Sequence, residues 1–143
     1  MLKSDYINFN GNLFLSSEIN LGINRAMRFG DGMFETIRII DGELVWWDEH
    51  MNRLKEGLNY LSLVIPDLFF EELLVDALSL INRNQLTAGG ILRILIYRKG
   101  GAGYTPTRYE FDYVIETETF ESNKFTLNQK GLLVGISETV TLN

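Results

Sequence analysis

The chain has 143 residues, enough for one domain with a buried core, and its 45% hydrophobic content excludes a disordered protein. Nineteen acidic against thirteen basic residues give a net charge of -6, which argues against nucleic acid as a partner because phosphates attract basic surfaces. The absence of cysteine excludes disulfides and thiolate metal sites, and no apolar run approaches the roughly 20 residues of a membrane helix.

These features, together with an N-terminus that lacks the apolar core of a signal peptide, predict a cytoplasmic protein. We expect neither a membrane partner nor a metal site. The chain opens with two β-prone runs, residues 6–10 and 12–15, around Asn10-Gly11, a signal for a type I′ hairpin turn. Residues 16–28 are polar and irregular, and we expect a loop there.

A long strand and a second hairpin follow. Gly30-Asp31-Gly32 predicts a turn, because glycine adopts positive φ at little cost. Residues 33–40 predict a strand, and the pair Asp41-Gly42 predicts the turn into a returning strand at 43–47.

The strand at 33–40 alternates in a way that leaves neither face wholly apolar. Phe34, Thr36 and Arg38 share one face, which we expect to line a polar cavity. Ile37 and Ile39 lie on the reverse face together with a carboxylate, and we expect both isoleucines to pack under helices.

Two amphipathic helices are predicted next. Residues 48–63 form the first, with Asp48 as N-cap and an apolar stripe at a spacing of three and four residues. The stripe consists of Met51, Leu54, Leu58 and Leu61. Pro66 prevents continuation of this helix, and Asp67 is the candidate cap of a second helix at 69–84.

The remaining chain predicts strands at 91–98, 111–118 and 131–136. A glycine-rich loop at 99–106 and a polar connection at 120–130 join them. Two helices among six or more strands, mostly joined by tight turns, predict a single α+β domain over residues 1–143. Its sheet is expected to be largely antiparallel, with the two main helices packed on it.

The stretch from Arg25 to Leu54 carries a specific pattern. It reads R-x-x-R-F-G-D-G-x-F-E-T-x-R, then a D-G hairpin, then H-x-x-R-L at a helix start. This order resembles the N-terminal domain of class IV aminotransferases, the fold-type IV pyridoxal-phosphate enzymes. They include branched-chain and D-amino-acid aminotransferases and aminodeoxychorismate lyase. The resemblance implies pyridoxal 5'-phosphate as cofactor, an amino acid and a 2-oxo acid as substrates, and a homodimer.

The resemblance also assigns roles to individual residues. Arg53, the arginine of H-x-x-R-L, corresponds to the residue that binds the cofactor phosphate, a role that suits the planar, permanently charged guanidinium. Phe34, Thr36 and Arg38 correspond to positions that line the substrate pocket, and Arg38 is a candidate for a substrate carboxylate or for pairing with a surface acid. Arg98, with the glycine-rich loop after it, occupies the place of substrate-carboxylate and specificity residues.

Two further residues near this pattern are interpreted as structural. His50 is the single histidine, and the chemistry of the resembling family takes its base from a lysine instead. Glu35 shares a strand face with isoleucines, so it must be paired or exposed, because burying a lone carboxylate is costly. Arg53, His50 and backbone amides are its candidate partners.

No catalytic residue is predicted within this chain. In the resembling family a lysine holds the cofactor as a Schiff base at the start of a second domain, and we expect that lysine beyond Asn143; Lys124 and Lys130 do not match it. The chain thus resembles the N-terminal domain alone, and by itself we expect it to be inactive.

The favoured function is amino-group transfer to a 2-oxo acid, branched-chain-like. Aminodeoxychorismate lyase, which releases 4-aminobenzoate and pyruvate, is the alternative, because Arg98-Lys99-Gly100-Gly101 also resembles that branch. A non-catalytic truncated domain is the second alternative.

Overall fold

One antiparallel sheet organises the protein. The structure is a computed structural model that describes residues 5–22, 24–101, 103–120, 124–125, 127 and 129–135. Within these residues the strands form a six-stranded sheet in the order β2-β1-β6-β5-β3-β4, and each neighbouring pair is antiparallel. The strands are β1 (Tyr6–Phe9), β2 (Asn12–Leu15), β3 (Gly32–Ile40), β4 (Glu43–Leu44), β5 (Gly89–Arg98) and β6 (Phe111–Glu118).

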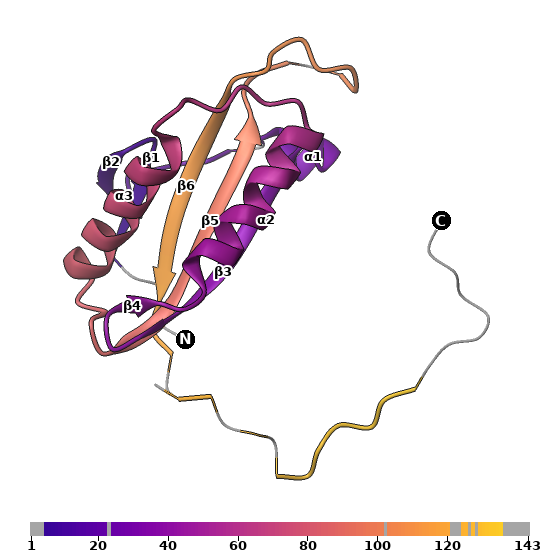
Figure 1. The fold of residues 1–143 in the computed structure, drawn as a ribbon. Helices are drawn as coiled ribbons and strands as arrows, with labels where there is room; N and C mark the ends of the chain where they lie inside the picture. The colour runs from indigo at the N-terminus through magenta and orange to yellow at the C-terminus, as the bar shows by residue number, and fades with distance from the viewer. Residues whose placement is uncertain are drawn as a thin grey trace.

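In the described part of the chain three helices accompany the sheet: α1 (Arg25–Phe29), α2 (Trp47–Tyr60) and α3 (Phe69–Arg83). Figure 1 shows α2 and α3 on the same face of the sheet, with α2 over β3 and α3 over β1 and β6. The predicted α+β fold with two main helices on a largely antiparallel sheet is therefore confirmed.

The two predicted hairpin turns are present. Asn10 and Gly11 have φ of 50° and 82°, and Asp41 and Gly42 have φ of 50° and 80°. Positive φ at both central positions defines the type I′ turn, whose twist matches that of the paired strands. The second hairpin is shorter than predicted: β4 ends at Leu44 instead of residue 47, because the chain turns at once into α2.

The helix starts differ from the predicted caps. Trp46, in a left-handed conformation, precedes α2, and Leu68 precedes α3; neither gives a side-chain cap hydrogen bond. Asp48 lies inside the first turn of α2, where its charge favours the positive end of the helix dipole. The predicted caps Asp48 and Asp67 were therefore wrong, although both helices are present.

The loop predicted at 16–28 contains the short helix α1. Asn24 caps it by accepting a hydrogen bond of 3.0 Å from the Met27 amide, and Gly30 ends it in a left-handed conformation with φ of 65°. Asparagine before a helix and glycine after it are the usual terminal signals, so the sequence did contain the information.

The strand predicted at 131–136 is not formed in its described part. Residues 131–135 are exposed and extend away from the sheet, and Ile136 lies outside the described residues. A β-prone run forms a stable strand only where a partner strand and a surface to pack on are available. Among the described residues none pairs with this segment.

The main core lies between the sheet and the helices α2 and α3. Ile37 and Ile39 of β3 are fully buried there, as predicted, and three members of the predicted α2 stripe, Met51, Leu54 and Leu58, pack against them. Each fully buried aliphatic side chain stabilises the fold by about 1.5–3 kcal/mol. The opposite face carries a smaller cluster around Ile7, Tyr97 and Val114.

Candidate functional site

A buried carboxylate on β3 joins the sheet to α2. Glu35 is 1% exposed, and its two oxygens accept hydrogen bonds from Arg53 and His50. The Arg53 Nε donates to Oε1 at 2.8 Å, the Arg53 Nη2 donates to Oε2, and the His50 Nδ1 lies 2.6 Å from Oε2. His50 and Arg53 are three residues apart and so share one face of α2. Arg53 and His50, two of the three candidate partners predicted for Glu35, therefore both contact it.

These donors explain how a charge is tolerated at this depth. Burial by itself would raise the pKa of Glu35, but the hydrogen bonds from Arg53 and His50 outweigh it and hold the pKa below its ordinary value of 4.5. Glu35 is therefore ionised at neutral pH. Because a carboxylate only accepts hydrogen bonds, the contact with His50 requires the proton of that ring to be on Nδ1.

Arg53 presents the rest of its guanidinium to solvent. Its side chain is 66% exposed, and among the described residues Nη1 has no hydrogen-bond partner. The hydrogen bond to Glu35 raises the pKa of Arg53 further, so the group is permanently charged. It lines a hollow of about 260 Å³ together with Trp46, Glu49 and His50. A cation held along one edge and open on the other suits an anionic ligand.

The predicted substrate-facing residues lie on the other face of β3. Phe34 is exposed and lines a separate hollow of about 220 Å³, shared with Leu21, Arg93, Leu95, Val114 and Glu116. Thr36 is exposed, and the guanidinium carbon of Arg38 lies 3.8 Å from the ring centre of Phe120. Their predicted roles in substrate binding stay predictions.

Among the residues that the structure describes, the hollows of Arg53 and Phe34 share no lining residue. The structure therefore brings Arg53 together with Glu35 and His50, and it does not bring it together with Phe34, Thr36 and Arg38. The sequence did not single out Arg93, whose Nη1 pairs with Glu118 at 2.8 Å beside the hollow of Phe34. Only the pairing of β3 with β5 places it there.

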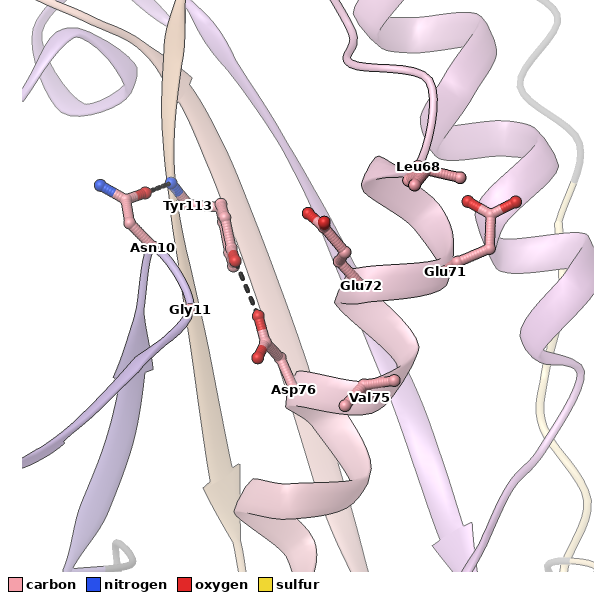
Figure 2. Close-up of a pocket in the computed structure, with 8 residues that line it drawn as sticks. All are labelled: Asn10, Gly11, Leu68, Glu71, Glu72, Val75, Asp76 and Tyr113. Atoms are coloured by element: carbon pink, nitrogen blue, oxygen red, sulfur yellow. Dashed lines mark hydrogen bonds between the residues drawn. The ribbon is translucent and has the colours of Figure 1, made fainter.

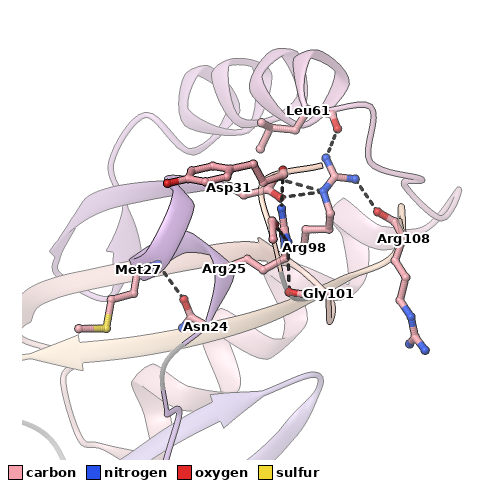
Figure 3. Close-up of polar contacts among 10 residues, drawn as sticks. Asn24, Arg25, Met27, Asp31, Leu61, Arg98, Gly101 and Arg108 are labelled. Atoms are coloured by element: carbon pink, nitrogen blue, oxygen red, sulfur yellow. Dashed lines mark hydrogen bonds and ion pairs between the residues drawn. The ribbon is translucent and has the colours of Figure 1, made fainter. Parts of the chain in front are cut away.

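Arg98 is buried in a network of structural contacts (Figure 3). Its Nε donates to Asp31 at 3.0 Å, Nη1 donates to the Arg108 carbonyl at 2.7 Å, and Nη2 donates to the Leu61 carbonyl at the end of α2. Arg98 therefore connects α2 to the end of β5. Its predicted role in binding a substrate carboxylate gains no support from these contacts and stays a prediction.

Arg25 is the second buried arginine of the network. Its Nε donates to Asp31 at 2.7 Å, and its two terminal nitrogens donate to the carbonyls of Gly101, Gly103 and Tyr104 at 3.0–3.3 Å. Arg25 thus fixes the glycine-rich loop from more than seventy residues away. The sequence pattern contained Arg25 without revealing this role.

Asp31 lies between the two arginines. Burial would raise the pKa of Asp31, but hydrogen bonds first from Arg25 and then from Arg98 hold it below its ordinary value of 3.8. The carboxylate is therefore ionised at neutral pH and balances charge that would otherwise be buried alone.

Acid is expected to destabilise the fold through Asp31 and Glu35. A carboxylate whose pKa is lower in the folded state stabilises the fold above its unfolded pKa, and this stabilisation is lost as the pH falls through the folded pKa. The free energy of unfolding should be flat near neutrality and should fall below about pH 4. Urea unfolding from neutral pH to about pH 2 measures it. A constant free energy throughout would contradict the lowered pKa values.

A larger hollow of about 420 Å³ lies between α3 and the β1–β2 turn (Figure 2). Its lining includes the acids Glu71, Glu72 and Asp76, and the Tyr113 hydroxyl donates to Asp76 at 2.7 Å. Burial and this contact raise the pKa of Tyr113. None of the residues predicted for a site lies in it.

Two kinds of feature are absent from the described part of the chain. There, no three histidine, aspartate or glutamate side chains are grouped so as to hold a metal ion. No helix in the same residues has the length and apolarity needed to cross a bilayer.

The geometry can be compared with known proteins. A family model described as amino-transferase class IV matches residues 32–140. The aminodeoxychorismate lyase of Vibrio harveyi is 31% identical over 118 residues, covering 81% of this chain and 42% of that protein. The D-alanine aminotransferase of Bacillus licheniformis is 37% identical over 114 residues, covering 72% of this chain and 39% of that protein.

Solved structures share the fold. The branched-chain amino acid aminotransferase from Escherichia coli matches with a TM-score of 0.73 at 26% identity, over 82% of this chain and 42% of that one. The branched-chain amino acid aminotransferase from Thermobaculum terrenum in its PLP-form matches with a TM-score of 0.71 at 14% identity, over 84% of this chain and 41% of that one. The chain spans about two fifths of the length of these relatives. From the family match, and in agreement with the motif between Arg25 and Leu54, the chain belongs to the class IV aminotransferase family.

Proposed function

We propose that the protein transfers an amino group between an amino acid and a 2-oxo acid with pyridoxal 5'-phosphate as cofactor, and that a branched-chain amino acid is the donor. This chain supplies the phosphate-binding half of the site and part of the substrate pocket. The family match supports the reaction class, and the D-alanine aminotransferase relative supports group transfer. The fold shared with branched-chain aminotransferases is compatible with the proposed donor.

The observation that carries the proposal is the open edge of Arg53. Its Nη1 is unpaired among the described residues, its other edge is fixed by Glu35, and Arg53 borders a hollow of about 260 Å³. A guanidinium in this state fits two oxygens of a phosphate group. When bound, the cofactor supplies an electron sink for the bond changes at the amino acid Cα. Arg53 contributes binding and orientation of the phosphate.

Aminodeoxychorismate lyase is a second candidate function. It is favoured by the 31% identity to the Vibrio harveyi lyase, which extends over 81% of this chain. Transfer and lyase activities in this family use the same cofactor, so the arrangement at Arg53 is compatible with both. The homodimer, the cytoplasmic location and the lysine beyond Asn143 stay predictions.

The functions are separated by assaying the full-length protein, including any chain that follows Asn143, with pyridoxal 5'-phosphate. The substrates are branched-chain L-amino acids and D-alanine, each with a 2-oxo acid acceptor, and aminodeoxychorismate. Turnover of a branched-chain donor supports the proposal. Release of 4-aminobenzoate without transfer establishes the lyase instead, and no turnover with any substrate supports the non-catalytic alternative.

Arg53→Ala is expected to weaken pyridoxal 5'-phosphate binding by roughly ten- to a hundredfold, because a charge-assisted contact to the phosphate is lost. Arg53→Lys should recover only part of the affinity, since a point charge lacks the planar fork. Titration of the cofactor measures both. Lys55→Ala removes a positive charge from the same helix outside the hollow and is the matched control. Equal affinity in Arg53→Ala and Lys55→Ala would overturn the assignment.

A further inference from the structure

Glu35 holds Arg53 in a single orientation. Two nitrogens of the guanidinium, Nε and Nη2, bond to the two oxygens of the carboxylate, which fixes the plane of the group and its rotation. Glu35 is itself immobile, because it is 1% exposed on a central part of β3 and is held by His50 at 2.6 Å. The Arg53 side chain is 66% exposed, so without this partner it would rotate freely in solvent.

A carboxylate next to a proposed phosphate site is unexpected on electrostatic grounds alone. A negative charge next to an anion site repels the anion, so a carboxylate that served only as a nearby charge would weaken phosphate binding. A carboxylate that orders the arginine has the contrary effect. Ordering one long side chain on binding weakens affinity by about two- to tenfold, and an arginine already ordered by Glu35 avoids that loss.

We propose that Glu35 is a positioning residue for the phosphate group: it holds Arg53 with Nη1 directed to the hollow, and phosphate binding is tighter with this carboxylate than without it. His50 stabilises the same arrangement, because its Nδ1–H donates a hydrogen bond to the Glu35 Oε2 that also accepts one from the Arg53 Nη2. The inference rests on the proposed role of Arg53 and adds to it that the arginine depends on a residue that never touches the ligand.

The chain offers a control in the same hollow. Glu49 lines it beside Arg53, on the exposed side of α2, and makes no hydrogen bond or ion pair with any described residue. Glu35→Gln and Glu49→Gln each remove one negative charge near the proposed phosphate. Only Glu35→Gln removes a carboxylate that contacts Arg53. If only the charge matters, both variants bind phosphate more tightly. If Glu35 positions Arg53, Glu35→Gln binds phosphate more weakly, whereas Glu49→Gln does not.

The test measures binding rather than turnover. Quenching of tryptophan fluorescence follows ligand binding, because the exposed Trp46 lines the hollow. Pyridoxal 5'-phosphate is compared with pyridoxal, which lacks the phosphate. We expect Glu35→Gln to weaken pyridoxal 5'-phosphate binding by about two- to tenfold, the size expected for ordering one long side chain. Pyridoxal binding should be unchanged, and Glu49→Gln should bind the phosphate as tightly as the unmodified protein or tighter.

A double-mutant cycle separates positioning from general damage. If Glu35 acts through Arg53, adding Glu35→Gln to Arg53→Ala should cause no further loss of affinity. Should Glu35→Gln prove unstable, His50→Gln, which removes a donor to the same carboxylate, is expected to show a smaller loss in the same direction. Loss of affinity in Arg53→Ala with none in Glu35→Gln or His50→Gln overturns the inference alone. No loss in Arg53→Ala overturns the proposed function itself.

Discussion

Asp31→Asn is expected to lower the free energy of unfolding by about 3–5 kcal/mol, the range for removing one partner of a buried ion pair. Asp31 is the shared partner of Arg25 and Arg98, both buried, at 2.7 Å and 3.0 Å. Asparagine has nearly the same shape but no charge, so the two buried guanidinium groups would keep only uncharged partners, namely carbonyl oxygens and the rings of Phe29 and Tyr109. The loss therefore comes from uncompensated charge and not from a cavity.

Urea and thermal unfolding measure this effect, and the melting temperature should fall by about 10 °C or more. Asp67→Asn, at an exposed aspartate just before α3, is the matched control and should change stability by about 0.5 kcal/mol or less. Equal stability of Asp31→Asn and Asp67→Asn would show that the carbonyl contacts of Arg25 and Arg98 are enough to stabilise their buried charges without Asp31.

Gly32→Ala is expected to cost about 3 kcal/mol, at the upper end of the usual range for overpacking. A Cβ at this position would lie 2.7 Å from the Ile96 carbonyl oxygen and 2.8 Å from the Ala26 Cβ. Neither atom moves without its backbone, and Ile96 belongs to the fully buried centre of β5. Relief of the clash would therefore separate β3 from β5 where Gly32 pairs with Tyr97.

Gly57→Ala is the informative comparison for this variant. Its Cβ would meet the terminal methyl of Met33 at 2.2 Å, which is closer still, but that methyl is the end of a flexible side chain. Alanine is also better than glycine in a helix by about 1 kcal/mol, so the two effects oppose each other. Denaturant midpoints of both variants test whether the mobility of the neighbour decides the outcome. A larger loss in Gly57→Ala than in Gly32→Ala would contradict the argument.

The sequence predicted well those features that depend on near neighbours. The alternation of β3 correctly placed Ile37 and Ile39 in the core, and the Asn10-Gly11 and Asp41-Gly42 pairs gave the correct turns. The motif around Arg53 gave the family, and the cost of burying a lone carboxylate pointed to the partners of Glu35. Each of these inferences needs only the local chain or one hairpin.

The features that were missed depend on distant parts of the chain. The contacts that bury Arg98 were not predicted, because its partners Asp31 and Leu61 lie 67 and 37 positions away in the sequence. The left-handed Trp46 before α2 has no local signal, because positive φ is rare for a bulky side chain. Residues 131–135 carry a strand pattern, and only the pairing in space decides whether a strand forms.

The hydrogen bonds from Arg25 to the glycine-rich loop have a consequence for which substitutions the loop can accept during evolution. Arg25 bonds to main-chain carbonyls, which every amino acid possesses, so the anchor is indifferent to the side chains it carries. Gly101 and Gly103 remain constrained by φ of 81° and 105°, but the exposed Tyr104 is not. Mutation can therefore exchange the side chain at position 104, with loss of its edge-on ring contact with Phe29, while the main-chain hydrogen bonds that hold the loop are kept.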